Sequence, residues 1–222
     1  MTLIHMPTEI RLQIYSYVVP DAPLKFPSNV YSGLLYCCKT IKDELEPELC
    51  KSIAVCAHEI AKRIREKGDE ILYTPPTTLS GWLHLTFSRP KTKNMFVDGD
   101  PFLEFMHLHF ITLTITFHND AQGYEYYRGR PETYQVAART LATHIRKSSR
   151  LDTTGACPAM RNCILDWSRS PSYASDWIMK SLGGNAMDLW EADAWLDDWG
   201  VMTGVSFSKK ELEPLRTLWI DD

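Results

Sequence analysis

The sequence has no excess of positive charge and no long apolar run. Its 24 lysines and arginines are outnumbered by 28 aspartates and glutamates, for a net charge of −4. No overall attraction to nucleic acid or to an anionic membrane follows from that balance. Polar residues interrupt every apolar stretch well before the roughly 18 residues of a membrane helix, and residues 1–7 lack the features of an export signal. We therefore expect a protein of the cytoplasm, the nucleus or both, with no membrane partner.

The motifs of the common enzyme classes are also missing. There is no GxSxG, HExxH, Walker A or GxGxxG pattern, and none of the six cysteines stands in a CxxC pair. Gly183-Gly184 lacks the basic residue of a phosphate loop, and Asp98-Gly99-Asp100 lacks the other ligands of a calcium loop. We predict a non-catalytic protein with no cofactor and no metal, whose cysteines are free thiols.

Two histidines are the best candidates for metal ligands, although a structural role is favoured. His107 and His109 would point to one face if they lay on a strand. That face continues as the apolar Ile111 and Leu113, and no third ligand is indicated. We therefore expect structural or exposed histidines.

The composition is that of a folded protein, with 44% hydrophobic and 23% charged residues in a chain of 222. Pro7 and Glu9 suit the first turn of a helix. The residues that follow at helical spacing form one apolar stripe: Ile10, Ile14, Tyr17 and Val18.

A second helical segment has an apolar face made of Leu34, Leu35, Cys38, Ile41 and Leu45. Its solvated face is expected to carry Lys39, Lys42, Asp43, Glu44 and Glu46. Pro47 has no backbone N–H, so it is expected to break this helix. Residues 52–55 are then expected to form a short strand, and residues 58–67 a helix that buries Ile60 and Ile64 and ends at Gly68.

The remainder of the chain has the pattern of a small sheet with helices. Strands are predicted over 82–87, 111–117 and 162–167, with a polar loop over 88–100. A helix that opens at Pro131 is expected to bury Tyr134, Ala137, Ala138, Leu141 and Ile145. The succession from 108 to 167 fits a parallel crossover unit, and an antiparallel arrangement stays open.

The C-terminal part is acidic and rich in tryptophan. Helices are predicted over 172–182 and 186–199, followed by a short one over 211–219. Trp195 and Trp199 would share a helix face, and together with Trp190 they either fill a core or anchor a partner. An acidic and aromatic surface would favour a basic partner.

The basic stretch over 128–150, with Tyr124, Tyr126 and Tyr127 just before it, is the one feature that could contact nucleic acid. A solvated helix face that pairs with the acidic C-terminal part is the favoured alternative.

Two segments together resemble an F-box domain. In the segment Met6–Val18, an apolar residue and Pro7 precede a polar residue and a glutamate, and isoleucines follow four residues apart. In the run Leu34–Leu45, a leucine pair precedes a cysteine, a basic residue and Ile41. The pattern is similar to that of F-box-like proteins abundant in filamentous fungi, and the resemblance covers about residues 4–50.

The resemblance implies a partner as well as a fold. F-box domains bind the Skp-type adaptor of a cullin–RING ubiquitin ligase, and the rest of the chain holds the target. Seven positions would contact the adaptor or form the core of the module: Met6, Pro7, Ile10, Ile14, Leu35, Cys38 and Ile41. We expect an α+β protein in which an F-box-like helical module over 1–50 packs on a small sheet flanked by helices. The body over 51–222 would end in Trp-rich acidic helices.

The leading hypothesis is thus a non-catalytic interaction adaptor, with a Skp-type protein as one partner and an unknown protein target as the other. Two alternatives stay open. A structural subunit of a larger complex predicts that the stripe with Ile10 and Ile14 is covered by the protein's own body or by an unrelated partner. An enzyme with an unrecognised site predicts a deep pocket lined by histidines and carboxylates with shifted pKa values.

Overall fold

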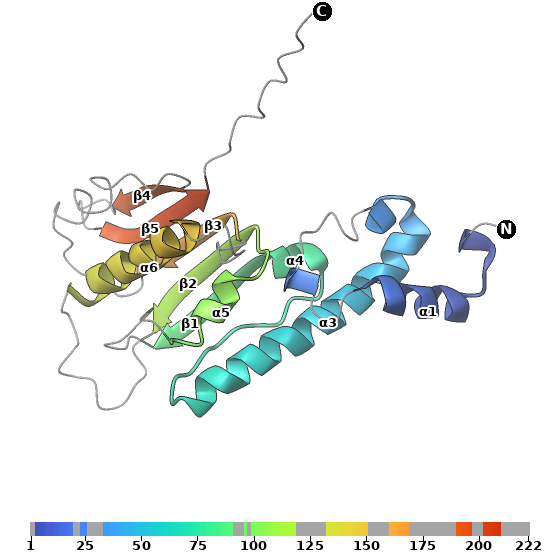
Figure 1. The fold of residues 1–222 in the computed structure, drawn as a ribbon, viewed down its shortest axis with the longest axis horizontal. Coiled ribbons are helices and arrows are strands. Elements are labelled where there is room, and N and C mark those ends of the chain that lie inside the picture. The colour runs from blue at the N-terminus through green and yellow to red at the C-terminus, as the bar shows by residue number, and fades with distance from the viewer. Residues whose placement is uncertain are drawn as a thin grey trace, which may run out of the picture.

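The computed structural model describes residues 3–19, 23–25, 33–90, 96, 99–118, 132–150, 160–168, 190–196 and 202–209. Two single-turn 3-10 helices, η1 (Leu3–His5) and η2 (Pro23–Lys25), flank the first α-helix. The helices are α1 (Thr8–Val18), α3 (Lys39–Glu66), α4 (Leu79–Leu83), α5 (Leu103–Met106) and α6 (Glu132–Arg150). The strands are β1 (His84–Pro90), β2 (Thr112–His118), β3 (Asn162–Asp166), β4 (Trp190–Leu196) and β5 (Met202–Lys209). Figure 1 shows that α1 and the first half of α3 extend away from the sheet.

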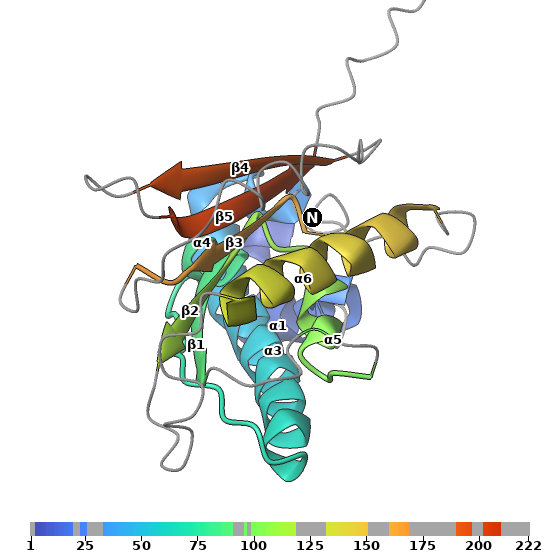
Figure 2. The ribbon, with the colours of Figure 1, turned by 90° about the vertical axis from the view of Figure 1, so that its left-hand side faces the viewer.

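The strands form one mixed sheet in the order β1-β2-β3-β5-β4. β1, β2 and β3 run parallel, while β5 pairs antiparallel with both β3 and β4. Figure 2 shows α3, α5 and α6 together on one side of the sheet. The expected α+β class, with N-terminal helices and a small sheet flanked by helices, is therefore confirmed.

The β2–α6–β3 unit matches its prediction. β2 buries Leu113, Ile115 and Phe117, each at most 2% exposed, while the threonines between them are half-buried. The helix α6 buries Ala137, Ala138, Leu141 and Ile145 in the same core. β2 and β3 are parallel, so the crossover alternative is the one the chain adopts. Pro131 and the side chain of Tyr134 lie outside the described part of the chain.

The prediction that Pro47 breaks the second helix is wrong. α3 runs unbroken for 28 residues with Pro47 inside it, so the strand expected over 52–55 is also wrong. Buried residues recur every three or four positions on both sides of the proline: Ile41, Leu45, Leu49, Ile53, Ala57, Ile60 and Ile64. Pro47 and Asp43 are exposed, so water reaches the backbone carbonyl that the proline leaves without a helical donor. Continuous burial of one face therefore outweighs the local cost.

The end of α3 is as predicted. Ile60 and Ile64 are buried, and Gly68 adopts φ +88° just after the C-cap residue Lys67. A left-handed residue at this position is the usual way to end a helix, and glycine adopts it without strain.

Two hydrophobic cores meet along α3. The smaller core contains Tyr15, Leu35, Ile41, Leu45 and Leu49. The larger one takes the residues of α3 from Cys50 onward, together with the sheet and α6. Leu79 packs against both cores, and its backbone N–H donates to Glu46 Oε1 at 2.9 Å. α3 thus belongs to the N-terminal helices and to the body at once.

The C-terminal prediction is wrong where it can be checked. Residues 190–196 form strand β4, and residues 202–209 form strand β5, which the sequence analysis did not predict. β4 is held by its antiparallel ladder with β5, and that pairing outweighs the helix preference of the alanines and the leucine in the segment. The helices expected over 172–182 and 211–219 lie outside the described residues.

Candidate interaction surfaces

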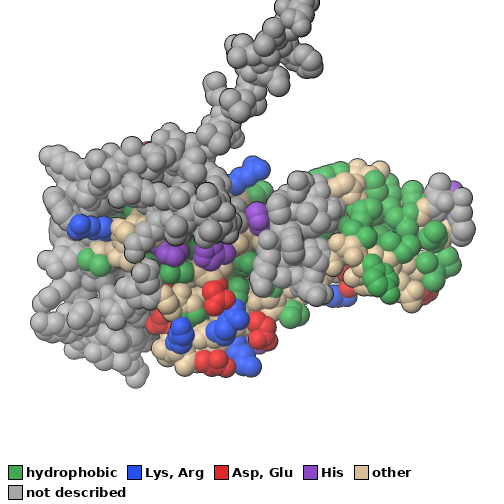
Figure 3. All heavy atoms as spheres, in the orientation of Figure 1, with side chains coloured by type: hydrophobic (Ala, Val, Ile, Leu, Met, Phe, Trp, Pro, Cys, Tyr) green, Lys and Arg blue, Asp and Glu red, His purple; other side chains and the backbone are tan. Residues whose placement is uncertain are grey.

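The helix α1 keeps its apolar stripe exposed. Ile10 is 42%, Tyr17 90% and Val18 37% exposed, and Ile14 is half-buried. We call these four residues the α1 stripe. Figure 3 shows a broad hydrophobic area over the end of the molecule that carries α1. An exposed apolar area of this kind on a folded domain is a candidate interaction surface.

Arg11 and Tyr15, and not the stripe, are the residues of α1 that face the protein. Arg11 and Tyr15 lie four residues apart and are 7% and 1% exposed. The Arg11 Nε donates to Glu44 Oε2 of α3 at 2.9 Å, and the Tyr15 hydroxyl donates to the same oxygen at 3.0 Å. Glu44, expected on a solvated face, is therefore a half-buried anchor for α1.

Arg11 also holds the segment in front of its own helix. Its Nη1 donates to the backbone carbonyl of Ile4 at 3.1 Å and to that of Met6. Its Nη2 donates to Thr8 Oγ1 at 3.0 Å and to Glu44. One guanidinium thus fixes η1, the first turn of α1 and α3 relative to one another, and we call this group with Glu44 and Tyr15 the Arg11 clamp.

The charges of the clamp support each other. The hydrogen bond from Arg11 is the main cause that lowers the pKa of Glu44, and the bond to Glu44 raises the pKa of Arg11. Burial, followed by the hydrogen bond to Glu44, raises the pKa of Tyr15 to about 12. The pair is therefore ionised and Tyr15 neutral at neutral pH.

The seven positions implied by the resemblance separate into two groups. Pro7 and Ile10 are exposed, and Met6, Ile14 and Cys38 are half-buried, so these side chains can reach a partner. Leu35 and Ile41 are 5% and 3% exposed and belong to the smaller core. Pro7 is the N-cap residue of α1, one position before the expected N1.

The tryptophan group does not form the helix face that the sequence analysis expected. Trp190 and Trp195 are in strand β4, so the argument from helical spacing does not apply to them. Trp199 lies outside the described residues. Of the basic stretch over 128–150, Arg139 is the one basic side chain described, and it is exposed on α6.

The histidine pair is likewise not arranged on a strand. His107 is the C-cap residue of α5, and His109 precedes β2, which begins at Thr112. His107 instead lies beside His144 of α6, with ring centroids 6.2 Å apart. Within the described ranges, no group of three or more His, Cys, Asp or Glu side chains could hold a metal ion. The described cysteines 37, 38, 50 and 163 are free thiols.

A buried arginine was missed by the sequence analysis. Arg89, expected in a polar loop, is 1% exposed at the end of β1. Its Nη1 donates to Asp100 at 3.1 Å and its Nη2 to Asp69 at 2.8 Å, while its guanidinium lies over the rings of Phe96 and Phe102. Asp100, expected in the same polar loop, is the buried acceptor of this ion pair. The alternation of Leu85, Phe87 and Arg89 was the one available signal, because it puts position 89 on the buried face.

None of the described helices combines the length and the apolar character that a membrane span requires. No protein-family model, curated protein or solved structure matches the chain, so its function is inferred from its own residues.

Proposed function

We propose that this chain is a non-catalytic interaction adaptor whose α1 stripe binds a Skp-type adaptor protein, while its body holds a second protein. The observation that carries the proposal is the exposure of Ile10, Tyr17 and Val18 on a helix whose polar residues Arg11 and Tyr15 face inward. A helix that only packed on its own body would have the opposite orientation, with its apolar side inward.

The Arg11 clamp supports this proposal because it orients the helix without using the stripe. α1 is anchored on α3 by charge-assisted hydrogen bonds, which leaves the apolar residues available. The surface is thus pre-organised, and a partner does not have to order the helix when it binds.

The energy available is adequate for a specific contact. Fully burying an aliphatic side chain is worth about 1.5–3 kcal/mol, and Ile10 has 42% of its surface left to bury. Tyr17 is 90% exposed and offers more area. The departure of the α1 end from the sheet in Figure 1 leaves room for a partner around it.

The test compares two single substitutions on the same helix. Ile10 and Leu12 are 42% and 38% exposed, but Ile10 is in the α1 stripe and Leu12 is on the other flank of the helix. Ile10→Asp should weaken co-purification and affinity for a Skp-type adaptor by at least about tenfold, whereas Leu12→Asp should change affinity by less than about twofold.

Both variants must retain the circular dichroism spectrum and melting profile of the wild type. Failure of the folded wild type to bind any Skp-type adaptor would overturn this assignment. In that case, partners recovered with the wild type but not with Ile10→Asp would identify the chain as a structural subunit of another complex.

A further inference from the structure

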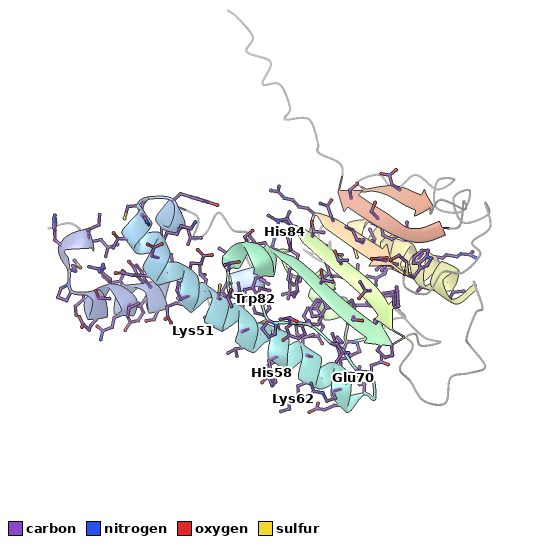
Figure 4. The ribbon with its side chains drawn as sticks, turned by 180° about the vertical axis from the view of Figure 1, so that it is seen from behind. Lys51, His58, Lys62, Glu70, Trp82 and His84 are labelled. Atoms are coloured by element: carbon purple, nitrogen blue, oxygen red, sulfur yellow. The ribbon has the colours of Figure 1, made fainter. Side chains whose placement is uncertain are left out.

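The sheet has one face that no described helix covers. The core side is formed by alternate residues such as Leu85, Leu113, Ile115, Cys163 and Phe207. Figure 2 shows α3, α5 and α6 on that side, and Figure 4, from behind, shows the strands in front of α6. The residues between the core positions point to the opposite side. We call that side the polar sheet face, and His84, labelled in Figure 4, stands at the start of its first strand.

Strand register defines the polar sheet face row by row. Its middle row crosses all five strands in the order Thr86, Thr114, Ile164, Ser206 and Asp193. The rows on either side also cross all five strands. One consists of His84, Thr112, Asn162, Ser208 and Glu191, and the other of Ser88, Thr116, Asp166, Gly204 and Trp195. Gly204 is buried, the other described residues of these rows are half-buried or exposed, and His84, Thr86 and Asp193 are exposed.

The polar sheet face carries hydroxyl and carboxylate groups but no lysine or arginine among its described side chains. Seven of its described side chains are hydroxyls, one is an amide, and two are the carboxylates of Asp166 and Asp193. No lysine or arginine is among the described side chains in its rows, although solvated surfaces ordinarily mix both signs of charge. Thr116 Oγ1 donates to the Phe87 carbonyl, and Asp166 Oδ1 accepts from the Ser168 N–H. The second oxygen of Asp166 and the exposed Asp193 remain to attract cations.

The size of the face limits what can lie on it. Five strands at the usual spacing span about 19 Å, and three rows span about 13 Å. The area is a few hundred Å², below the roughly 800 Å² per partner of a standard protein interface. It therefore accommodates an extended segment or a loop of a partner.

From this geometry we propose that the polar sheet face binds a basic, hydrogen-bonding polypeptide segment of the protein that this adaptor holds. Lysine or arginine side chains of the segment pair with Asp166 and Asp193, and its polar groups bond to the hydroxyl rows between them. Nucleic acid fits less well, because the described side chains of these rows include no lysine or arginine to pair with phosphate, and the carboxylates repel it. The proposal extends the proposed function by assigning the second surface of the adaptor.

The test uses two ten-residue probe peptides, one alternating lysine with threonine and the other alternating glutamate with threonine, each with a fluorophore. Fluorescence anisotropy with the full chain should detect binding of the lysine peptide and none of the glutamate peptide. Binding should weaken as salt rises above 0.1 M, where the Debye length is about 10 Å. Thr114→Lys, at the centre of the middle row, should raise the Kd of the lysine peptide by about tenfold.

Thr143→Lys is the matched control, because it adds the same charge at an exposed position of α6 on the other side of the sheet. It should change the Kd by less than about twofold, which is the change expected of a charge that is away from the bound segment. Thr86→Lys, on the exposed edge strand β1, replaces Thr114→Lys if the central variant melts at a lower temperature.

The proposal is overturned if the lysine peptide does not bind the wild type. It is also overturned if Thr114→Lys, or Thr86→Lys in its place, weakens peptide binding no more than the control Thr143→Lys does. Ile10→Asp should leave peptide binding unchanged. Failure of the wild type to bind any Skp-type adaptor, with binding of the lysine peptide intact, would therefore count against the proposed function and not against the polar sheet face.

Discussion

At the scale of single residues, polar side chains decide how the N-terminal helix is oriented. Arg11 donates to Glu44 on α3, to two backbone carbonyls and to Thr8, so its guanidinium is saturated with acceptors. Tyr15 adds a second donor to Glu44. Burial disfavours the charged forms of Arg11 and Glu44, but the hydrogen bond between them outweighs it, so the pKa of Glu44 is lowered and that of Arg11 is raised.

The clamp makes one prediction about pH. The pKa of Glu44 is lowered on folding, so its stabilising contribution is complete above the unfolded value near 4.5 and is lost as pH falls through the folded value. The melting temperature of the wild type should therefore exceed that of Glu44→Gln at neutral pH. The difference should shrink steadily below pH 4.5, as measured by thermal denaturation followed by circular dichroism.

Glu46→Gln is a suitable control for this measurement, because Glu46 is on the same helix and accepts a backbone hydrogen bond from Leu79 without an arginine partner. A melting difference for Glu44→Gln that stayed constant from pH 7 to pH 3 would contradict the assigned role of the Arg11 clamp.

At the scale of elements, α3 shows how packing along one face overrides a local break. The buried positions keep helical spacing from Ile41 to Ile64, so a break at Pro47 would take one half of the helix out of register with its core. The proline is on the exposed side, where its missing donor costs least.

Replacing this proline should therefore stabilise the protein. Pro47→Ala restores a helical donor, and proline in a helix interior costs about 3 kcal/mol relative to alanine. The greater freedom of the unfolded chain offsets roughly 1 kcal/mol of that gain. We expect the free energy of unfolding in urea to rise by about 1–2 kcal/mol. Pro47→Gly should gain about 1 kcal/mol less than Pro47→Ala, and a destabilised Pro47→Ala would show that the proline is required by the packing around α3.

At the scale of the whole molecule, a buried ion pair joins segments that are distant in the sequence. Arg89 at the end of β1 binds Asp69 just after α3 and Asp100 just before α5. Asp100 also accepts from the backbone N–H groups of Phe96 and Phe102 at 2.9 Å. The arginine thus closes the end of the larger core, where it lies over two of the aromatic rings.

Removing the charge from this site should be costly. Arg89→Met keeps much of the volume but leaves Asp100, at 4% side-chain exposure, without its cation. Breaking a buried pair in this way costs about 3–5 kcal/mol, which urea denaturation should detect as a lower free energy of unfolding. Arg63→Met is the control, since the Arg63–Glu104 pair is about half exposed and should contribute less than about 1 kcal/mol. Equal effects of the two substitutions would contradict a structural role for Arg89.

The sequence by itself determined those elements whose pattern is local. The alternation of β2, the apolar stripes of α1 and α6, and the glycine after α3 are all periodicities or single-residue preferences, and each was predicted correctly. The apolar residues of the α1 stripe follow from helical spacing in the sequence. That they lie exposed on the folded protein is visible only in the structure.

Only the tertiary structure decided the features that depend on distant partners. The inward orientation of Arg11 requires Glu44, 33 positions away, and β4 is a strand because β5 offers it a ladder. Arg89 is buried because the fold brings Asp69 and Asp100 to it. In each case the free energy of a long-range contact exceeds the local preference of the segment, and no local pattern carries that information.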